Sequence, residues 1–213
     1  SFDLTRTQDW LADQRTATGE RRHLQLSDGS VLDLNTATAV DVDLAQRRIT
    51  LVDGELALNV PGAAAVTVRT RYGELSVSQA DVCVRQQASG CLVSVLEGSV
   101  QVRDLNGQMA TLQGGQQAPL KASGLGAWVP FDVLQLGWRD GVLTAQNQGL
   151  GDFLRELQRY RPGVLRWEPS LERLRVSGSF RLDDTDTVLQ NLSKTLPVKV
   201  RYLTRYWVSI EAA

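Results

Sequence analysis

The sequence is short of the residues that build most metal sites and nucleophilic active sites. Its 213 residues include one histidine and two cysteines. A zinc site usually takes four Cys or His ligands, or three and a water, so no metal site is expected. A nucleophile-histidine pair would have to use His23, which alternates with Leu24 and Leu26 as an outward strand side chain does. The sequence therefore predicts no catalytic, metal-ligating or cofactor-binding residues.

The chain also lacks an excess of one charge and a long apolar run. Its 23 Lys and Arg nearly balance 24 Asp and Glu, giving a net charge of −1. This balance disfavours nucleic acid and anionic membranes as partners. No apolar run approaches the ~20 residues that span a bilayer, and no signal-peptide pattern is present. Because the chain starts at Ser1 and its one methionine is Met109, we expect any anchor to lie upstream.

The first half of the chain has the pattern of short β-strands. Between residues 19 and 121, apolar and polar side chains alternate with a period of two. Asp-Gly, Tyr-Gly, Glu-Gly and Asn-Gly pairs separate the runs, and glycine supplies the positive φ that tight turns need. Many short strands with glycine turns predict an all-β domain. The pattern leaves a sandwich, a barrel and a solenoid-like stack open.

The second half changes to helical periodicity. Leu150, Phe153, Leu154 and Leu157 fall on one helical face, and a Pro-Gly pair ends that helix. The alternating stretch 174–182 predicts a strand with one buried and one wet face. A second helix is expected from Asp184 to Leu196, and further strands are expected at residues 164–167, 198–203 and 206–211.

The two helix-strand stretches repeat at an offset of 35 residues. Leu154 falls on Leu189 and Pro162 on Pro197. We therefore predict two domains, an all-β domain and a small α+β domain of two helix-strand repeats. The predicted boundaries are a juxtamembrane segment at residues 1–18, the all-β domain at 19–121, a linker at 122–137 and the α+β domain at 138–213.

The acidic run at residues 183–186 has two readings. It resembles part of a calcium loop, but the glycine and distant glutamate of an EF-hand are absent. Carboxylates also favour the first turn of a helix, where they cap free amides and face the positive end of the dipole. We expect Asp184 to be such a cap.

The two cysteines leave a disulfide as an open alternative. Cys83 and Cys91 flank a predicted turn at residues 86–90, and an oxidising compartment would allow a bond between them. If the neighbouring valines all face inward, however, strand parity points the two side chains to opposite faces.

Several motifs in the first half resemble the FecR-type periplasmic domain. The opening reads T-x-x-G-E-R-R, a strand, D-G-S and then L-N, and a later stretch reads V-x-V-x-E-G-x-V. One departure stands out, because the chain has Gln79 and Ala80 where the family usually has Gly-Thr, which puts the local turn geometry in doubt. The motifs lie at residues 16–35, 38–43, 47–48, 54–55, 93–100 and 114–116.

The second half resembles the short domain shared by secretins and TonB-dependent receptors. The residues that carry this resemblance are 157–163, 174–180 and 196–198. Together the resemblances imply the periplasmic part of an anti-sigma regulator that binds the N-terminal signalling domain of an outer-membrane TonB-dependent transporter. They also imply an upstream helix in the inner membrane, a cytoplasmic sigma factor as the final target and an iron-siderophore type of signal.

We hypothesise that the partner adds a strand to an exposed sheet edge in the second half. The candidate edges are residues 175–181 and 207–210. Arg175 and Arg181 have a solvated face as their alternative, and Trp207 has core packing. The predicted partner-binding residues are Trp167, Arg175, Ser177, Ser179, Arg181, Trp207 and Ser209.

Two other functions are set against this one. The first is a structural or assembly domain of a secretion or envelope complex that uses the same short C-terminal domain. The second is an enzyme or a sugar-binding β domain, which would need clustered histidines, paired carboxylates or an aromatic platform in one pocket.

Overall fold

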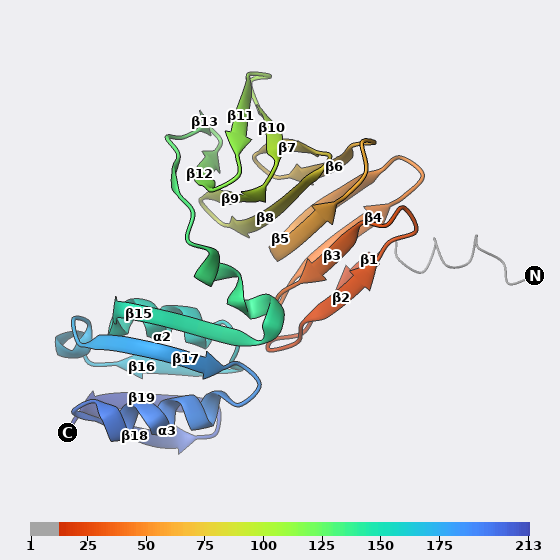
Figure 1. Ribbon diagram of the computed structural model, residues 1–213. Helices are drawn as coiled ribbons and strands as arrows, with labels where there is room; N and C mark the ends of the chain where they lie inside the picture. The colour runs from red at the N-terminus through yellow and green to blue at the C-terminus, as the bar shows by residue number, and fades with distance from the viewer. Residues whose placement is uncertain (1–12) are drawn as a thin grey trace, which may run out of the picture. The chain divides into compact units, whose positions relative to one another are not determined.

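A computed structural model describes residues 13–213 and divides them into two compact units (Figure 1). Of the described residues, unit 1 takes 13–17 and 21–133, and unit 2 takes 18–20 and 134–213. Most of the predicted juxtamembrane segment, residues 1–12, lies outside the described residues. Residues 13–17 belong to unit 1, because β1 (Asp13–Arg15) pairs with β4 (Ala39–Asp43).

Unit 1 is built around one long strand, β5 (Arg48–Val60), which belongs to two sheets. Its first half pairs with β4 and with β6 (Val66–Thr70), and its second half pairs with β3 (Val31–Leu34) and β8 (Ala80–Gln87). The change of sheet occurs at Gly54, where φ is +90° and an added Cβ would lie 2.2 Å from Thr38 Oγ1. Only glycine fits this corner.

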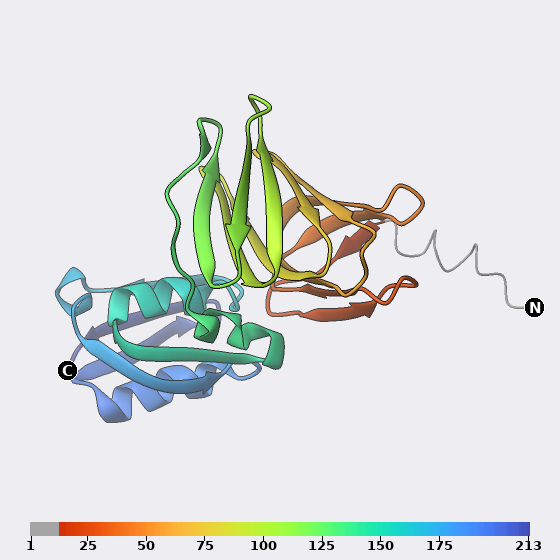
Figure 2. The ribbon, with the colours of Figure 1, turned by 45° about the horizontal axis from the view of Figure 1, so that its top comes forward.

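The remaining strands extend the two sheets on either side of β5. The first sheet continues through β7 (Gly73–Val77), β10 (Ser99–Asp104) and β11 (Met109–Gln113), as Figure 2 shows. The second continues through β9 (Gly90–Glu97) and β12 (Gln116–Lys121), and β2 (Arg22–Gln25) pairs with β3.

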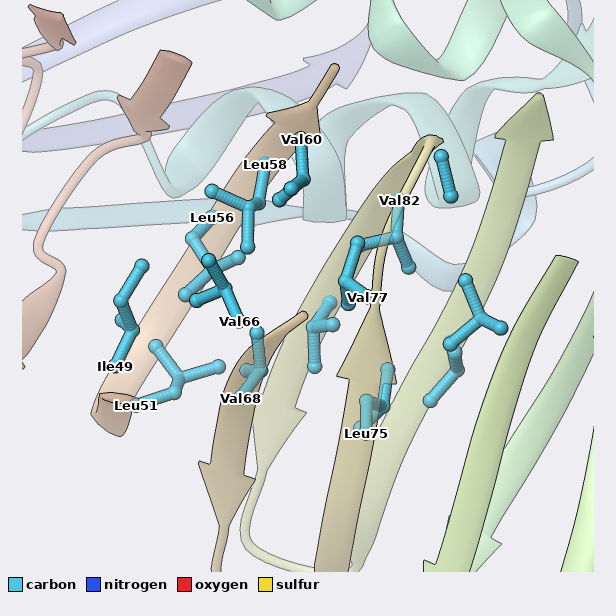
Figure 3. Packing of buried hydrophobic residues seen from close by; sticks show 14 of the residues in the cluster. Ile49, Leu51, Leu56, Leu58, Val60, Val66, Val68, Leu75, Val77 and Val82 are labelled. Carbon is cyan, nitrogen blue, oxygen red and sulfur yellow. The ribbon is translucent and has the colours of Figure 1, made fainter. Parts of the chain in front are cut away.

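The inward side chains of both sheets form one apolar core. Leu and Val side chains from β5, β6, β7 and β8 lie against one another there (Figure 3). This shared core is the sandwich alternative, and the prediction of a mostly β protein is confirmed. The labelled residues are Ile49, Leu51, Leu56, Leu58, Val60, Val66, Val68, Leu75, Val77 and Val82.

Residues 122–137, predicted as a linker, contain regular structure. The short strands β13 (Gly124–Leu125) and β14 (Val129–Pro130) both pair with β12. The N–H of Phe131 donates to the Gly115 carbonyl at 2.7 Å. A 3-10 helix, η1 (Val133–Asp140), follows. Gly124 and Pro130 of this segment therefore lie within short strands.

Unit 2 has two small sheets and two helices. One sheet pairs β15 (Val142–Gly149) with β17 (Arg175–Arg181), and the other has the order β16-β19-β18. The helices α2 (Leu150–Gln158) and α3 (Thr185–Thr195) each contact a strand of both sheets, so the helical layer joins them. The other elements are β16 (Val164–Trp167), η2 (Pro169–Leu171), β18 (Val198–Thr204) and β19 (Trp207–Ala212).

The expected duplication is present and begins one strand earlier than the sequence indicated. Each repeat is a strand, a helix and a strand: β15-α2-β16 and then β17-α3-β18. The sequence pattern did not predict β15, because its alternation is weak and a register shift between Ala145 and Gln148 interrupts it. The first strands of the two repeats pair with each other, and the last strands lie on either side of β19.

Candidate protein-interaction site

The predicted polar residues of β17 share one face, and three of the four make hydrogen bonds to β15. Ser177 Oγ accepts from the Asn147 N–H at 2.9 Å, and Ser179 Oγ lies 3.1 Å from Thr144 Oγ1. Arg175 Nη1 donates to the Asn147 carbonyl at 3.1 Å. These side chains therefore stabilise the irregular pairing of β15 with β17.

Arg181 has the solvated position that was its alternative. Its side chain is 82% exposed and pairs with Asp183 at 3.3 Å. Exposed pairs of this kind contribute only about 0–1 kcal/mol. Within residues 13–213, β17 pairs only with β15, so the other edge of β17 has no neighbouring strand.

The terminal strand β19 lies in the middle of its sheet. It pairs in parallel with β16 and antiparallel with β18, so both of its edges are occupied. The prediction that residues 207–210 form a docking edge is therefore wrong. Trp207 and Ser209 point to the outer face of the sheet, because Val208 and Ile210 on the other face are buried. Trp207 is 47% exposed, which differs from core packing.

Trp167 lies in a polar cluster near the start of α2. Its Nε1 donates to Glu172 Oε1 at 2.8 Å, and the same oxygen accepts from Arg155 at 2.6 Å. The Arg155 guanidinium also lies 5.6 Å from the Trp167 ring centroid. The hydrogen bond from Trp167, with the Arg155 contact, lowers the pKa of the Glu172 carboxyl below its usual value. Trp167 is thus engaged within unit 2.

The strand that sequence reasoning missed as an edge is β18. Within residues 13–213 it pairs only with β19, so its other edge presents unpaired N–H and C=O groups. Five of its seven residues are exposed. Strand order depends on tertiary pairing, which the alternating pattern of the sequence does not reveal.

The turn between β18 and β19 gathers exposed apolar side chains. Tyr202, Leu203, Tyr206 and Trp207 are the exposed large hydrophobic residues that the structure describes after residue 133. The Arg205 guanidinium lies 4.8 Å from the centre of the Tyr206 ring. Exposed aromatic residues are often the anchors of protein-binding surfaces.

A buried arginine and Tyr202 of β18 bind the same carboxylate at the start of the second helix. Arg161, whose side chain is 9% exposed, donates to Thr185 Oγ1 at 2.8 Å and pairs with Asp186 at 2.7 Å. The Tyr202 hydroxyl donates to the same Asp186 carboxylate at 3.1 Å. Burial and the Asp186 charge raise the pKa of Tyr202 above its usual value. The edge strand is therefore held by the start of α3, where Asp184 caps the helix through the Thr187 N–H as predicted.

Residues from the motifs of the first half meet inside unit 1. Asn35 Nδ2 donates to Glu55 Oε1 at 2.9 Å, and the Thr38 hydroxyl donates to the Glu55 carbonyl at 3.2 Å. Thr16 Oγ1 donates to the Asn35 carbonyl at 2.7 Å and accepts from the Thr38 N–H at 2.8 Å. All four residues are buried. These motif residues hold β1, β3, β4 and β5 together.

The departure at Gln79 coincides with unusual backbone geometry. Gln79 has a φ of +47°, in the left-handed region that favours glycine. The turn is crowded as well, because a Cβ added at Gly98 would lie 2.4 Å from the Gln79 carbonyl oxygen. The family's glycine would suit this position better than the glutamine present here.

Both cysteines are free and buried, so the disulfide alternative is not realised. Cys83 pairs across the ladder with Ser94, three residues from Cys91 on the same strand. Three residues of a strand span about 10 Å, which exceeds the ~7 Å Cα separation that a disulfide allows. The odd offset also places the two cysteine side chains on opposite faces of the sheet. Burial raises the pKa of the Cys91 thiol, which lowers its reactivity.

Two features of residues 13–213 bear on other functions. The described chain holds no group of three or more His, Cys, Asp or Glu side chains arranged to bind a metal. Among its helices, none has the length and apolar character that crossing a membrane requires.

Comparison with known proteins relates most of the first unit to a family. Residues 12–101 match the model of the FecR protein family. Two crystal structures of a proposed anti-sigma factor from Parabacteroides distasonis share the fold at 19% identity, and no curated protein matches. One covers 95% of this chain and 100% of its own with a TM-score of 0.73, and the other covers 94% and 98% with 0.71. The match over residues 12–101 confirms the resemblance of the first half of the chain to the FecR family.

Proposed function

We propose that this chain is the periplasmic sensor part of an anti-sigma regulator that binds the N-terminal signalling domain of a TonB-dependent outer-membrane transporter. In the full-length protein an upstream helix would tether it to the inner membrane. Transporter loading with an iron-siderophore type of ligand would be relayed to a cytoplasmic sigma factor. The proposed role is binding without catalysis.

The open edge of β18 is the observation that carries this proposal. A partner strand that pairs there would satisfy N–H and C=O groups that have no ladder partner in the described chain. The exposed residues Tyr206 and Trp207 lie at the end of the same hairpin and would add apolar contact area. The second edge of β17 is the other open candidate.

Proline substitution tests strand addition at β18. Successive N–H groups of an edge strand point alternately to the neighbouring strand and outward. Lys199→Pro and Val200→Pro remove two successive N–H groups of β18. One of these substitutions therefore removes a hydrogen bond to β19, and the other, here called the outward variant, removes only an N–H that points away from β19. We expect the outward variant to keep the fold by circular dichroism and to bind the signalling domain at least tenfold more weakly.

Two controls make this test decisive. Ser177→Pro asks the same question of β17, and the N-terminal domain of a secretin serves as an unrelated partner for the assembly alternative. If the folded β18 and β17 variants bound the signalling domain with unchanged affinity, strand addition would be contradicted. Preference for the secretin domain would contradict the proposed function itself.

A further inference from the structure

The two faces of β18 differ in chemistry along its open edge. Lys199 and Arg201 point to the outer face of the sheet, in register with Glu211 and Ser209 of β19. Val200 and Tyr202 point to the inner face, in register with Ile210 and Val208. A strand added to β18 would place its own side chains in the same two rows, because paired residues of neighbouring strands share a face.

The outer row of β18 has an unbalanced positive charge. Within residues 13–213, Glu211 is the one carboxylate that forms an ion pair with these two side chains, and its Oε1 lies 4.0 Å from Arg201 Nη1. Lys199 has no ion pair in the described chain. Opposite charges on directly paired residues stabilise a sheet, and like charges destabilise it. The row therefore favours a neighbour with carboxylates and disfavours one with lysines.

The inner row favours apolar side chains. Val198 is buried, Val200 is half-buried and Tyr202 is 42% exposed, so the apolar row becomes more open toward the turn. Apolar side chains of an added strand would cover Val200 and Tyr202 and extend the inner layer.

We infer that β18 binds a partner strand in which carboxylate and apolar side chains alternate, with the carboxylates beside Lys199 and Arg201. The identity of the partner as a transporter signalling domain rests on the proposed function. The chemistry of the strand rests on the two rows of β18 alone.

The other open edges of unit 2 fit such a strand less well. The pairing of β15 with β17 is interrupted between Ala145 and Gln148, and Gly178 of β17 has a φ of +146°. β16 is only four residues long. β18 has seven residues, and its irregularity lies at the turn end, between Tyr202 and Thr204.

A charge-exchange experiment with short peptides tests the inference. The probes are two capped seven-residue peptides, one alternating glutamate with valine and one alternating lysine with valine, titrated into the whole chain and followed by amide NMR shifts. We expect the glutamate peptide to shift β18 amides and to bind about tenfold more tightly than the lysine peptide. In the double variant Lys199→Glu, Arg201→Glu, the preference should reverse.

Arg166→Glu is the matched control. Arg166 is exposed, pairs with Ser209 and lies on the same outer face, but on the far side of β19 from β18. If the peptide binds at the edge of β18, the preference of this variant for the glutamate peptide over the lysine peptide should stay within about threefold of that of the unaltered chain. If Arg166→Glu and the double variant lost the preference for the glutamate peptide to the same extent, an edge-specific site would be contradicted. The absence of β18 amide shifts with the glutamate peptide would contradict it as well.

The isolated signalling domain separates this inference from the proposed function. If it binds the unaltered chain and the double charge variant equally well, the inferred strand chemistry is wrong while the proposed function stands. If it fails to bind while the peptides show the reversal, the proposed function is wrong while the strand chemistry stands.

Discussion

Glu55 illustrates what the motif residues do at the scale of single side chains. It accepts from Asn35 and lies in the network that contains Thr16 and Thr38, inside the β unit. The motifs therefore identify the family through residues that stabilise the fold. They carry no information about which residues bind a partner, so the candidate site had to come from the structure.

Removing the Glu55 carboxylate should destabilise unit 1. In Glu55→Ala, the buried Asn35 amide loses its hydrogen bond to the Glu55 carboxylate at 2.9 Å, and the loss of a buried hydrogen bond of this kind costs about 1–3 kcal/mol. Urea unfolding measures this change. Glu74→Ala is the control, because its exposed pair with Arg69 should contribute less than ~1 kcal/mol. Equal effects of the two substitutions would contradict a structural role for the network.

Replacing Gln79 by glycine should stabilise the protein. The left-handed backbone at this position costs a non-glycine residue about 1 kcal/mol, part of which is offset by the larger unfolded-state entropy of glycine. We expect Gln79→Gly to raise the midpoint of thermal unfolding. Ala80→Gly, at the first position of β8, should lower it. A lower midpoint for Gln79→Gly would show that the glutamine is not strained.

Glu172 should give a pH-dependent contribution to stability. The Trp167 hydrogen bond and Arg155 lower its pKa below the ordinary value of 4.5, so the ionised carboxylate favours the folded state. Its contribution is complete above the unfolded pKa and is lost as pH falls through the folded pKa. Glu172→Gln should therefore be less stable than the unaltered chain at pH 7, and the difference should shrink below pH ~4.5. A difference that stays constant down to pH 3 would contradict this role.

At the scale of elements, periodicity predicted the helices of unit 2 and most of its strands. The apolar face of α2 and the Asp184 cap of α3 are strong local signals, and the structure has both elements at the expected places. The position of β19 between β16 and β18 was not predictable, because either order satisfies the same alternation. The edge strand β18 therefore emerged only from the ladder.

The turn from α2 into β16 should tolerate no side chain at Gly163. Its φ is +92°, and an added Cβ would lie 2.1 Å from the Tyr206 carbonyl oxygen, which accepts from the Val164 N–H. Gly163→Ala should cost about 2–4 kcal/mol, combining left-handed strain with displacement of the β18-β19 turn.

Gly107→Ala separates the two causes. Gly107 has a similar φ of +81° with nothing within 4 Å of an added Cβ, so it should cost only about 1–2 kcal/mol. Urea unfolding of both variants gives the comparison. Equal costs would mean that the contact with Tyr206 adds nothing.

At the scale of the whole chain, the polar and apolar groups described above have different roles in the two units. Unit 1 packs its two sheets around a single apolar core, and residues of the family motifs hold its strands together. Unit 2 leaves β18 with an open edge and gathers exposed aromatic residues at one turn. We therefore place the structural family motifs in unit 1 and propose unit 2 as the partner-binding part.

Amide hydrogen exchange of β18 with and without the transporter signalling domain tests this assignment most directly. Strand addition predicts that the outward N–H groups of residues 198–204 exchange slowly only in the complex, while the N–H groups that already bond to β19 change less. A complex that forms with normal affinity and leaves the exchange of every β18 amide unchanged would contradict the assignment.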